Sequence, residues 1–291
     1  MAASVLFDAP GPGTLARHRI YTALSAVVLA AIFGLIIWQL WRKDQFASRF
    51  WEPFVTPSII ELLLVGLSKT LQAAVFAIAG ALLLGVLLGV GKLSDFRLLR
   101  WPSWLVVEFF RAVPLLLVIV ATWFYFGAKP GTTAFLALVV GLVLYNGAVI
   151  AEIFRAGINA VPKGQSEAAY AIGMRKSMVM RIVLIPQAVK IMLPALISQA
   201  IVALKDTSLG YAILAPGLTV VGKEIDRTFR NTVQTAFIIA VIYIVMNLLL
   251  TWLATWAQKR YAGEKKIEVS AVGTVTDWST GNSQSGVMTQ Q

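Results

Sequence analysis

The sequence predicts an all-α polytopic membrane protein with six membrane spans. Of its 291 residues, 58% are hydrophobic and 13% are charged, against about 25% charged residues in a soluble domain. The apolar residues gather in runs long enough to cross a bilayer as helices, which takes about 20 residues each. These observations exclude an ordinary soluble enzyme or binding module.

The first 41 residues predict an arm followed by one helix. Residues 1–19 contain a Pro-Gly-Pro-Gly stretch and are expected to form a disordered arm. The apolar run 20–41 follows a basic segment and has about 22 residues, whereas the core of a signal peptide usually has about 7–15. We therefore expect a first transmembrane helix, with Trp38 and Trp41 in the aromatic belt at its end.

Five further spans are expected within residues 59–258. Their predicted ranges are 59–92 (spanning part 71–91), 102–126, 134–154, 191–211 and 233–257. A loop is expected at 42–58, a tight turn at 127–133 and irregular chain at 212–232. Residues 262–291 are rich in Ser, Thr, Gly and Gln, which predicts a disordered tail. Gly80, Gly85 and Gly89 recur at near-helical spacing, so the helix 59–92 should pack closely on a neighbour.

The basic residues predict the orientation. If the N-terminus lies inside, more than half of the 25 lysines and arginines fall in inner segments, as the positive-inside rule requires. Both termini and the loop 160–186 would then be cytoplasmic. This bias also accounts for the net charge of +11, so we expect membrane lipid around the chain and no nucleic acid as a partner.

A short polar interval divides the two halves of the predicted bundle. Pro162, Ser166 and Glu167 are typical of a helix start. Gly173 then permits a bend that a side chain would hinder. A compact helix followed by a glycine bend could dock into a groove of another protein.

This interval resembles the EAA loop of bacterial ABC importer permeases. The family pattern is Glu-Ala-Ala, three residues, Gly, nine residues, Ile, one residue, Leu-Pro. Val183 and Ile185 replace its Ile and Leu with other apolar residues. The positions that match in register are Glu167, Ala168, Ala169, Gly173 and Pro186.

The resemblance extends over roughly residues 60–258. The segments 110–116, 151–165 and 204–209 look like those of polar amino-acid permeases, although Ala112 and Val113 depart from the family pattern. The start of the chain, with its extra span, is similar to one of the two permeases of actinobacterial glutamate importers.

The resemblance implies the type I ABC importer transmembrane domain, with a five-helix core plus one N-terminal helix, in a bacterial cell membrane. It implies a second permease subunit, two ATP-binding subunits and an extracytoplasmic substrate-binding protein. ATP and Mg²⁺ would bind to the partner ATPase, and this chain would bind no cofactor. Transport of a polar amino acid such as glutamate would proceed by alternating access, coupled to the ATPase through Glu167, Ala168, Ala169 and Gly173.

Polar residues at membrane depth are expensive and mark candidate pathways. Such a group lies near the outer end of the fifth predicted span: Lys205, Asp206, Thr207 and Ser208. We predict that it lies near the substrate pathway. A structural ion pair involving Lys205 is the alternative.

Other polar residues favour structure over catalysis. Glu108 and Arg111, like Glu152 and Arg155, are three residues apart and can pair on one helix face. The Gly217–Lys223 stretch has P-loop spacing, but Glu224 occupies the position of the Mg²⁺-binding hydroxyl. With no cysteine and one histidine, an enzyme is poorly supported. An ion-coupled secondary transporter and a non-transporting membrane scaffold remain alternatives, but neither gives the 160–186 loop a role.

Overall fold

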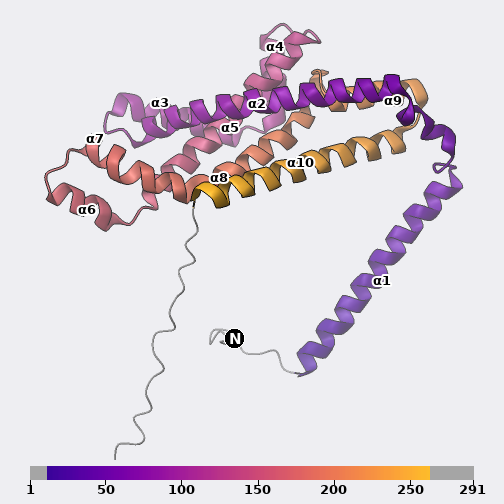
Figure 1. Ribbon diagram of the computed structural model, residues 1–291, viewed down its shortest axis with the longest axis horizontal. Helices are drawn as coiled ribbons and strands as arrows, with labels where there is room; N and C mark the ends of the chain where they lie inside the picture. Colours follow the sequence, from indigo (N-terminus) through magenta and orange to yellow (C-terminus); the bar gives the residue numbers. More distant parts are fainter. Residues whose placement is uncertain (1–11, 263–291) are drawn as a thin grey trace, which may run out of the picture.

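The structure is a computed structural model, and it describes residues 12–262. All regular elements in that range are helices. The framework consists of elongated helices that run alongside one another (Figure 1). They are α2 (Pro57–Leu93), α5 (Thr132–Asn159), α8 (Ile185–Asp206) and α10 (Thr232–Ala262).

The close packing predicted for the glycines of α2 is confirmed. Gly80, Gly85 and Gly89 lie against α5, next to Val143, Ile150 and Phe154, respectively. A Cβ atom added to Gly85 would lie 2.5 Å from Cγ2 of Ile150 and 3.0 Å from the carbonyl oxygen of Gly147. Since α2 has no side chain at these positions, the two helices approach closely.

The segment 102–126, predicted as one helix, is two. Helix α3 (Arg97–Ala112) is followed by α4 (Leu115–Tyr125) at an angle of 107°. The break lies at Val113, which adopts an extended conformation (φ −82°, ψ 132°). The reason is Pro114, because a proline disfavours helical geometry in the residue before it. Helix α4 consequently projects away from the long axis of the bundle (Figure 1).

The segment 212–232 was predicted to be irregular, and this is wrong for its second half. After α8, a 3₁₀ segment η4 (Thr207–Ile213) leads to a further α-helix, α9 (Leu218–Phe229). The N–H of Leu218 donates to Oγ1 of Thr70 on α2 over 2.9 Å. Gly222 lies inside α9, where it lets the helix pack against Ile239 of α10. Lys223 is therefore in mid-helix, unlike the lysine of a P-loop.

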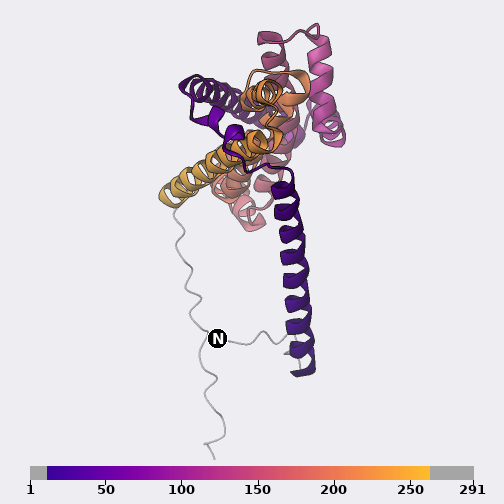
Figure 2. The same ribbon diagram turned by 90° about the vertical axis from the view of Figure 1, so that its right-hand side faces the viewer.

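Helix α1 (Pro12–Arg42) extends away from the other helices (Figures 1 and 2). The disordered arm predicted for 1–19 is thus helical from Pro12 on, and residues 1–11 lie outside the described range. The tail predicted for 262–291 lies outside it as well, except for Ala262, the last residue of α10.

The chain between α1 and α2 is anchored on the start of α10. It contains two short 3₁₀ segments, η1 (Ser48–Phe50) and η2 (Glu52–Val55). Asn231 Nδ2 donates to the Phe50 carbonyl over 3.0 Å, and Gln234 donates to the Gln45 carbonyl. The base of α1 is therefore fixed even though the helix itself is exposed.

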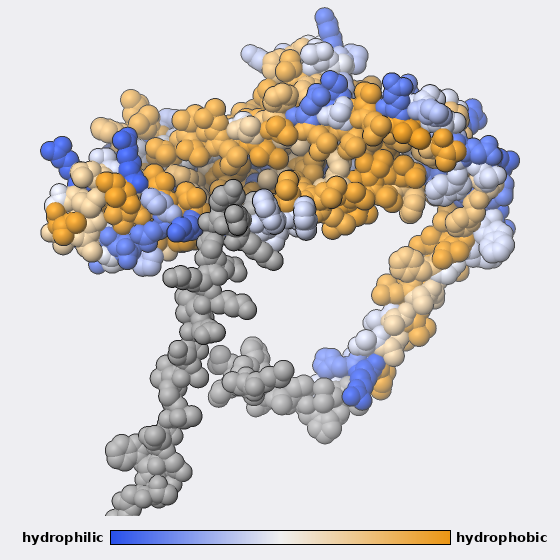
Figure 3. Space-filling model, viewed as in Figure 1, coloured by the Kyte–Doolittle hydropathy of each residue, from blue (hydrophilic) through white to orange (hydrophobic). Residues whose placement is uncertain are grey.

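The surface agrees with a membrane-spanning chain. Hydrophobic residues cover most of the side of the bundle. Hydrophilic residues gather at its two ends, and also at the tip beside α4 and along part of the upper edge (Figure 3). Among the described residues, five helices are long and apolar enough to cross a membrane, or six if the bent pair α3–α4 counts as one span.

Candidate functional site

The motif residues lie on a separate short helix at one end of the bundle. Helix α6 (Lys163–Ala171) follows Pro162 and stands off the ends of the long helices (Figure 1). Glu167 and Ala168 are exposed, whereas Ala169 is buried. One face of α6 is thus held against the molecule and the other is free to meet a partner.

The predicted glycine bend is present directly after α6. Gly173 has φ +82°, a conformation that glycine adopts without steric cost. Its N–H donates to the Tyr170 carbonyl over 2.9 Å, and that of Met174 donates to the Ala169 carbonyl over 3.1 Å. These bonds satisfy carbonyl groups at the helix end, as glycine-based caps do.

Two contacts connect this loop to the bundle. Lys176, on the short helix α7 (Lys176–Met178), forms an ion pair with Asp95 in the connection between α2 and α3. Gln187 of α8 donates to Gln165 of α6 over 3.4 Å. A π-helical segment, η3 (Val179–Leu184), joins α7 to α8. Movement of α6 can therefore be transmitted to both α3 and α8.

The residues predicted for the pathway lie where α8 passes into η4. Lys205 is exposed, Asp206 and Ser208 are half-buried, and Thr207 is buried. The Thr207 hydroxyl donates to the Leu204 carbonyl over 2.6 Å, so it caps its own helix. Within residues 12–262, Lys205 has no carboxylate within ion-pair distance, so the alternative structural ion pair is not seen there.

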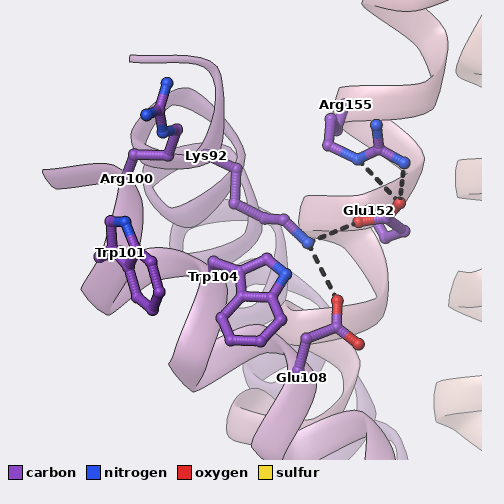
Figure 4. A pocket seen from close by; sticks show the side chains of 7 residues that line it. All are labelled: Lys92, Arg100, Trp101, Trp104, Glu108, Glu152 and Arg155. Atoms are coloured by element: carbon purple, nitrogen blue, oxygen red, sulfur yellow. Dashed lines mark hydrogen bonds and ion pairs between the residues drawn. The ribbon is translucent and has the colours of Figure 1, made fainter. Parts of the chain in front are cut away.

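Both predicted ion pairs are present, and they belong to one larger cluster. Arg111 Nη1 lies 3.5 Å from Glu108 Oε1, and Arg155 Nε lies 2.8 Å from Glu152 Oε1. Lys92, the last residue of the predicted helix 59–92, joins them. Its Nζ lies 3.2 Å from Glu108 Oε1 and 2.8 Å from Glu152 Oε2 (Figure 4). The cluster thereby connects α2, α3 and α5.

A buried amide pair was not predicted. Asn146 of α5 is fully buried, and its Oδ1 accepts a hydrogen bond from Gln199 Nε2 of α8 over 2.6 Å. The available signal was that polar residues inside spans usually face another helix or a cavity. Both amides also line a small apolar pocket between α2, α5 and α8.

Known proteins resemble this chain over most of the helical bundle. The family model described as "Binding-protein-dependent transport system inner membrane component" matches residues 81–263. The chain is 41% identical over 223 residues to the glutamate transport system permease protein GluD of Corynebacterium glutamicum, covering 75% of this chain and 82% of GluD. It is 31% identical over 219 residues to the glutamate/aspartate import permease protein GltK of Escherichia coli O157:H7, covering 72% and 96%.

Solved structures show the same architecture. The chain is 35% identical, with a TM-score of 0.64, to a chain in the crystal structure of an amino acid ABC transporter with histidines, covering 69% of this chain and 94% of that one. A chain of the MetNI methionine ABC transporter in an inward-facing conformation matches with a TM-score of 0.55 and 23% identity, covering 72% and 98%. The second likeness bears on the fold alone.

Proposed function

The chain belongs to the family of binding-protein-dependent transport system inner membrane components and is an ABC permease, and we propose that the amino acid it carries is glutamate. Its fold is the type I ABC importer transmembrane domain. GluD and GltK, both named for glutamate, support this substrate. The secondary-transporter alternative has no support in these similarities.

The position of α6 is the main support for an ATP-driven transport mechanism. Glu167 and Ala168 are exposed on a helix that stands off the bundle, and Gly173 turns the chain back toward it. Tyr170 and Ile172 add exposed apolar surface, 48% and 79% accessible. On this basis α6 is the coupling helix. An ATP-binding subunit binds and moves the segment that contains Glu167, Ala168, Ala169 and Gly173.

The partners follow from this role. Two ATP-binding subunits hold ATP and Mg²⁺, and this chain holds no cofactor. A second permease subunit completes the translocation pathway, and an extracytoplasmic binding protein delivers the amino acid. ATP binding favours one of two permease conformations, because a ligand shifts such an equilibrium by its different affinity for the two states.

We infer that α6 lies in the cytoplasm of a bacterial cell, at the inner face of the plasma membrane. The charge bias supports this, because more than half of the 25 lysines and arginines fall in segments that are then on the inner side. Helix α10 ends on the same side as α6 (Figure 1), and α1 as a single span would start there. Both termini are then cytoplasmic.

The segment 205–208 lies at the outer, extracytoplasmic half of the pathway. A lysine at membrane depth that has no described ion partner needs water or an anionic ligand around it. Glutamate carries a side-chain carboxylate that Lys205 can attract, and the Ser208 hydroxyl can donate a further hydrogen bond.

The test is reconstitution of the complex in vesicles with ATP enclosed on the α6 side. Labelled L-glutamate should accumulate only when the binding protein and hydrolysable ATP are present, and unlabelled aspartate should compete better than glutamine. Accumulation driven by an ion gradient without ATP would overturn the mechanism. Uptake of glutamine or arginine in preference to glutamate would overturn the substrate.

A further inference from the structure

The charge cluster around Lys92 borders a pocket of about 510 Å³ at the α6 end of the bundle. The pocket lies between the end of α2, the first turns of α3 and the last turns of α5. We propose that it binds the headgroup of an anionic phospholipid from the cytoplasmic leaflet. Its lining residues are Lys92, Arg100, Trp101, Trp104, Glu108, Glu152 and Arg155 (Figure 4).

The pocket retains positive charge after its internal ion pairs are counted. The two carboxylates, Glu108 and Glu152, face Lys92, Arg111 and Arg155 in the ion pairs. Arg100 is additional, and among the described residues no hydrogen bond or ion pair engages its guanidinium. An anion entering the pocket therefore meets an excess of basic groups.

In the described part of the chain, three basic side chains that line the pocket still have N–H groups free to bind such an anion. Lys92 has a side chain only 6% exposed and uses two of its three donors on the carboxylates. Arg155 gives Nε and Nη2 to Glu152, which leaves further N–H groups, because a guanidinium has five. Arg100 rises from one side of the pocket and Arg155 from the other (Figure 4). Arginine suits a phosphate because its planar fork can donate two parallel hydrogen bonds.

The surroundings favour a lipid over a soluble anion. Trp101 and Trp104 line the pocket, their rings 6.0 Å apart and edge to face, and tryptophan concentrates at the headgroup level of membranes. Leu98, Trp101 and Leu105 follow one face of α3 and are 86%, 64% and 61% exposed. This stripe offers acyl chains a contact surface beside the basic pocket. Basic pockets between helices on the cytoplasmic side are a common form of lipid-headgroup site.

A lipid phosphate bound in this pocket would contact both α3 and α5. Arg155 lies on the last turns of α5, which leads into α6. The start of α3 follows the connection in which Asp95 pairs with Lys176 of the coupling loop, the segment 160–186 that contains α6 and α7. A phosphate held between Arg100 and Arg155 would therefore link the two elements that flank that loop.

The experiment is native mass spectrometry of the delipidated, detergent-solubilised complex titrated with phosphatidylglycerol. Phosphatidylcholine with the same acyl chains serves as the comparison lipid. We expect selective retention of phosphatidylglycerol by the wild type and about tenfold weaker binding by the Arg100→Gln complex, the effect of losing one charge-assisted contact. Arg97→Gln is the matched control, because Arg97 is exposed on the same helix but does not line the pocket. It should bind the lipid as the wild type does.

The other outcomes overturn the proposal in distinguishable ways. Equal losses in Arg97→Gln and Arg100→Gln would show a diffuse surface attraction. Competition by sn-glycerol 3-phosphate as effective as that of the diacyl lipid would show a site for a soluble phosphate, and displacement by L-glutamate would show a substrate site. No selective retention by the wild type would show that the pocket is closed in the complex. The readout is independent of transport, so it stands apart from the test of glutamate uptake.

Discussion

Lys92 reaches from the end of α2 to Glu152 on α5, with 2.8 Å between Nζ and Oε2. The same ammonium group lies 3.2 Å from Glu108 Oε1 on α3. One buried charge thus connects three helices at the end of the bundle that carries α6. Arg155 and Arg111 complete the pairing of the two carboxylates.

Replacing Lys92 by methionine should destabilise the complex. The side chain keeps its length, but Glu108 and Glu152 lose a shared donor, and hydrogen bonds to charged groups contribute about 1.5–3 kcal/mol. We expect a lower midpoint of thermal unfolding for the detergent-solubilised complex. Lys190→Met, on the exposed surface of α8, is the control and should unfold like the wild type. A Lys92→Met complex as stable as the control would show that Lys92 contributes nothing to holding the helices.

Gly85→Ala should weaken the packing of α2 on α5. The new Cβ would lie 2.5 Å from Ile150 Cγ2, closer than carbon atoms approach, and overpacking of this kind costs about 1–3 kcal/mol. Gly34→Ala on α1 is the matched control, because it would meet nothing within 4 Å. The midpoint of thermal unfolding should be lower for Gly85→Ala than for Gly34→Ala. Equal midpoints would refute the close contact between α2 and α5.

The parts of the fold that the sequence predicts are those set by local patterns. Apolar run lengths located the spans, and the spacing of glycines indicated which face of α2 packs closely. The three-residue spacing within each of the pairs Glu108–Arg111 and Glu152–Arg155 indicated the two local ion pairs. Each of these patterns depends on residues within one helix.

The parts that were missed depend on contacts between distant segments. The position of Lys92 in the cluster follows from the meeting of α2, α3 and α5, which no spacing in the sequence reveals. Helix α9 was missed because Pro216, Gly217 and Gly222 indicated irregular chain. The structure shows that the missing side chain of Gly222 instead lets α9 pack against α10. The break before Pro114 was different, since proline gives a local signal, which the prediction of one helix over 102–126 did not use.

The orientation can be measured by single-cysteine labelling, because the natural chain has no cysteine. Thr132 and Ser177 are both exposed; Thr132 begins α5, and Ser177 lies in α7, beyond the opposite end of α5. With α6 in the cytoplasm, Thr132→Cys should react with an impermeant maleimide on intact cells, and Ser177→Cys only after permeabilisation. The opposite pattern would invert the proposed topology.

Gly173→Val should separate ATP hydrolysis from transport. A valine at φ +82° costs about 1–2 kcal/mol in a left-handed conformation, so the bend after α6 should relax and shift the surface offered to the ATPase. We expect an assembled complex whose ATPase activity no longer responds to the loaded binding protein.

The matched control for that variant is Gly131→Val. Gly131 has φ +76° and open space around it, but it lies at the start of α5, at the opposite end of that helix from the coupling loop. A valine there is also strained by the positive φ, and the variant should keep its coupling. Loss of coupling in both variants would show that backbone strain anywhere in the chain abolishes coupling. Normal coupling in Gly173→Val would show that the bend after α6 is not needed for coupling.

Lys205→Gln should reduce glutamate uptake while leaving the complex stable. Lys205 is exposed at the end of α8 and has no ion partner among the described residues, so its loss breaks no contact that holds the bundle together. A contact with the substrate carboxylate would contribute about 1.5–3 kcal/mol, which corresponds to a fall in transport efficiency of roughly 10- to 100-fold. Labelled uptake in proteoliposomes measures this, with Lys190→Gln on the same helix as control. A less stable Lys205→Gln complex would instead assign the residue a structural role, and unchanged uptake would place Lys205 outside the pathway.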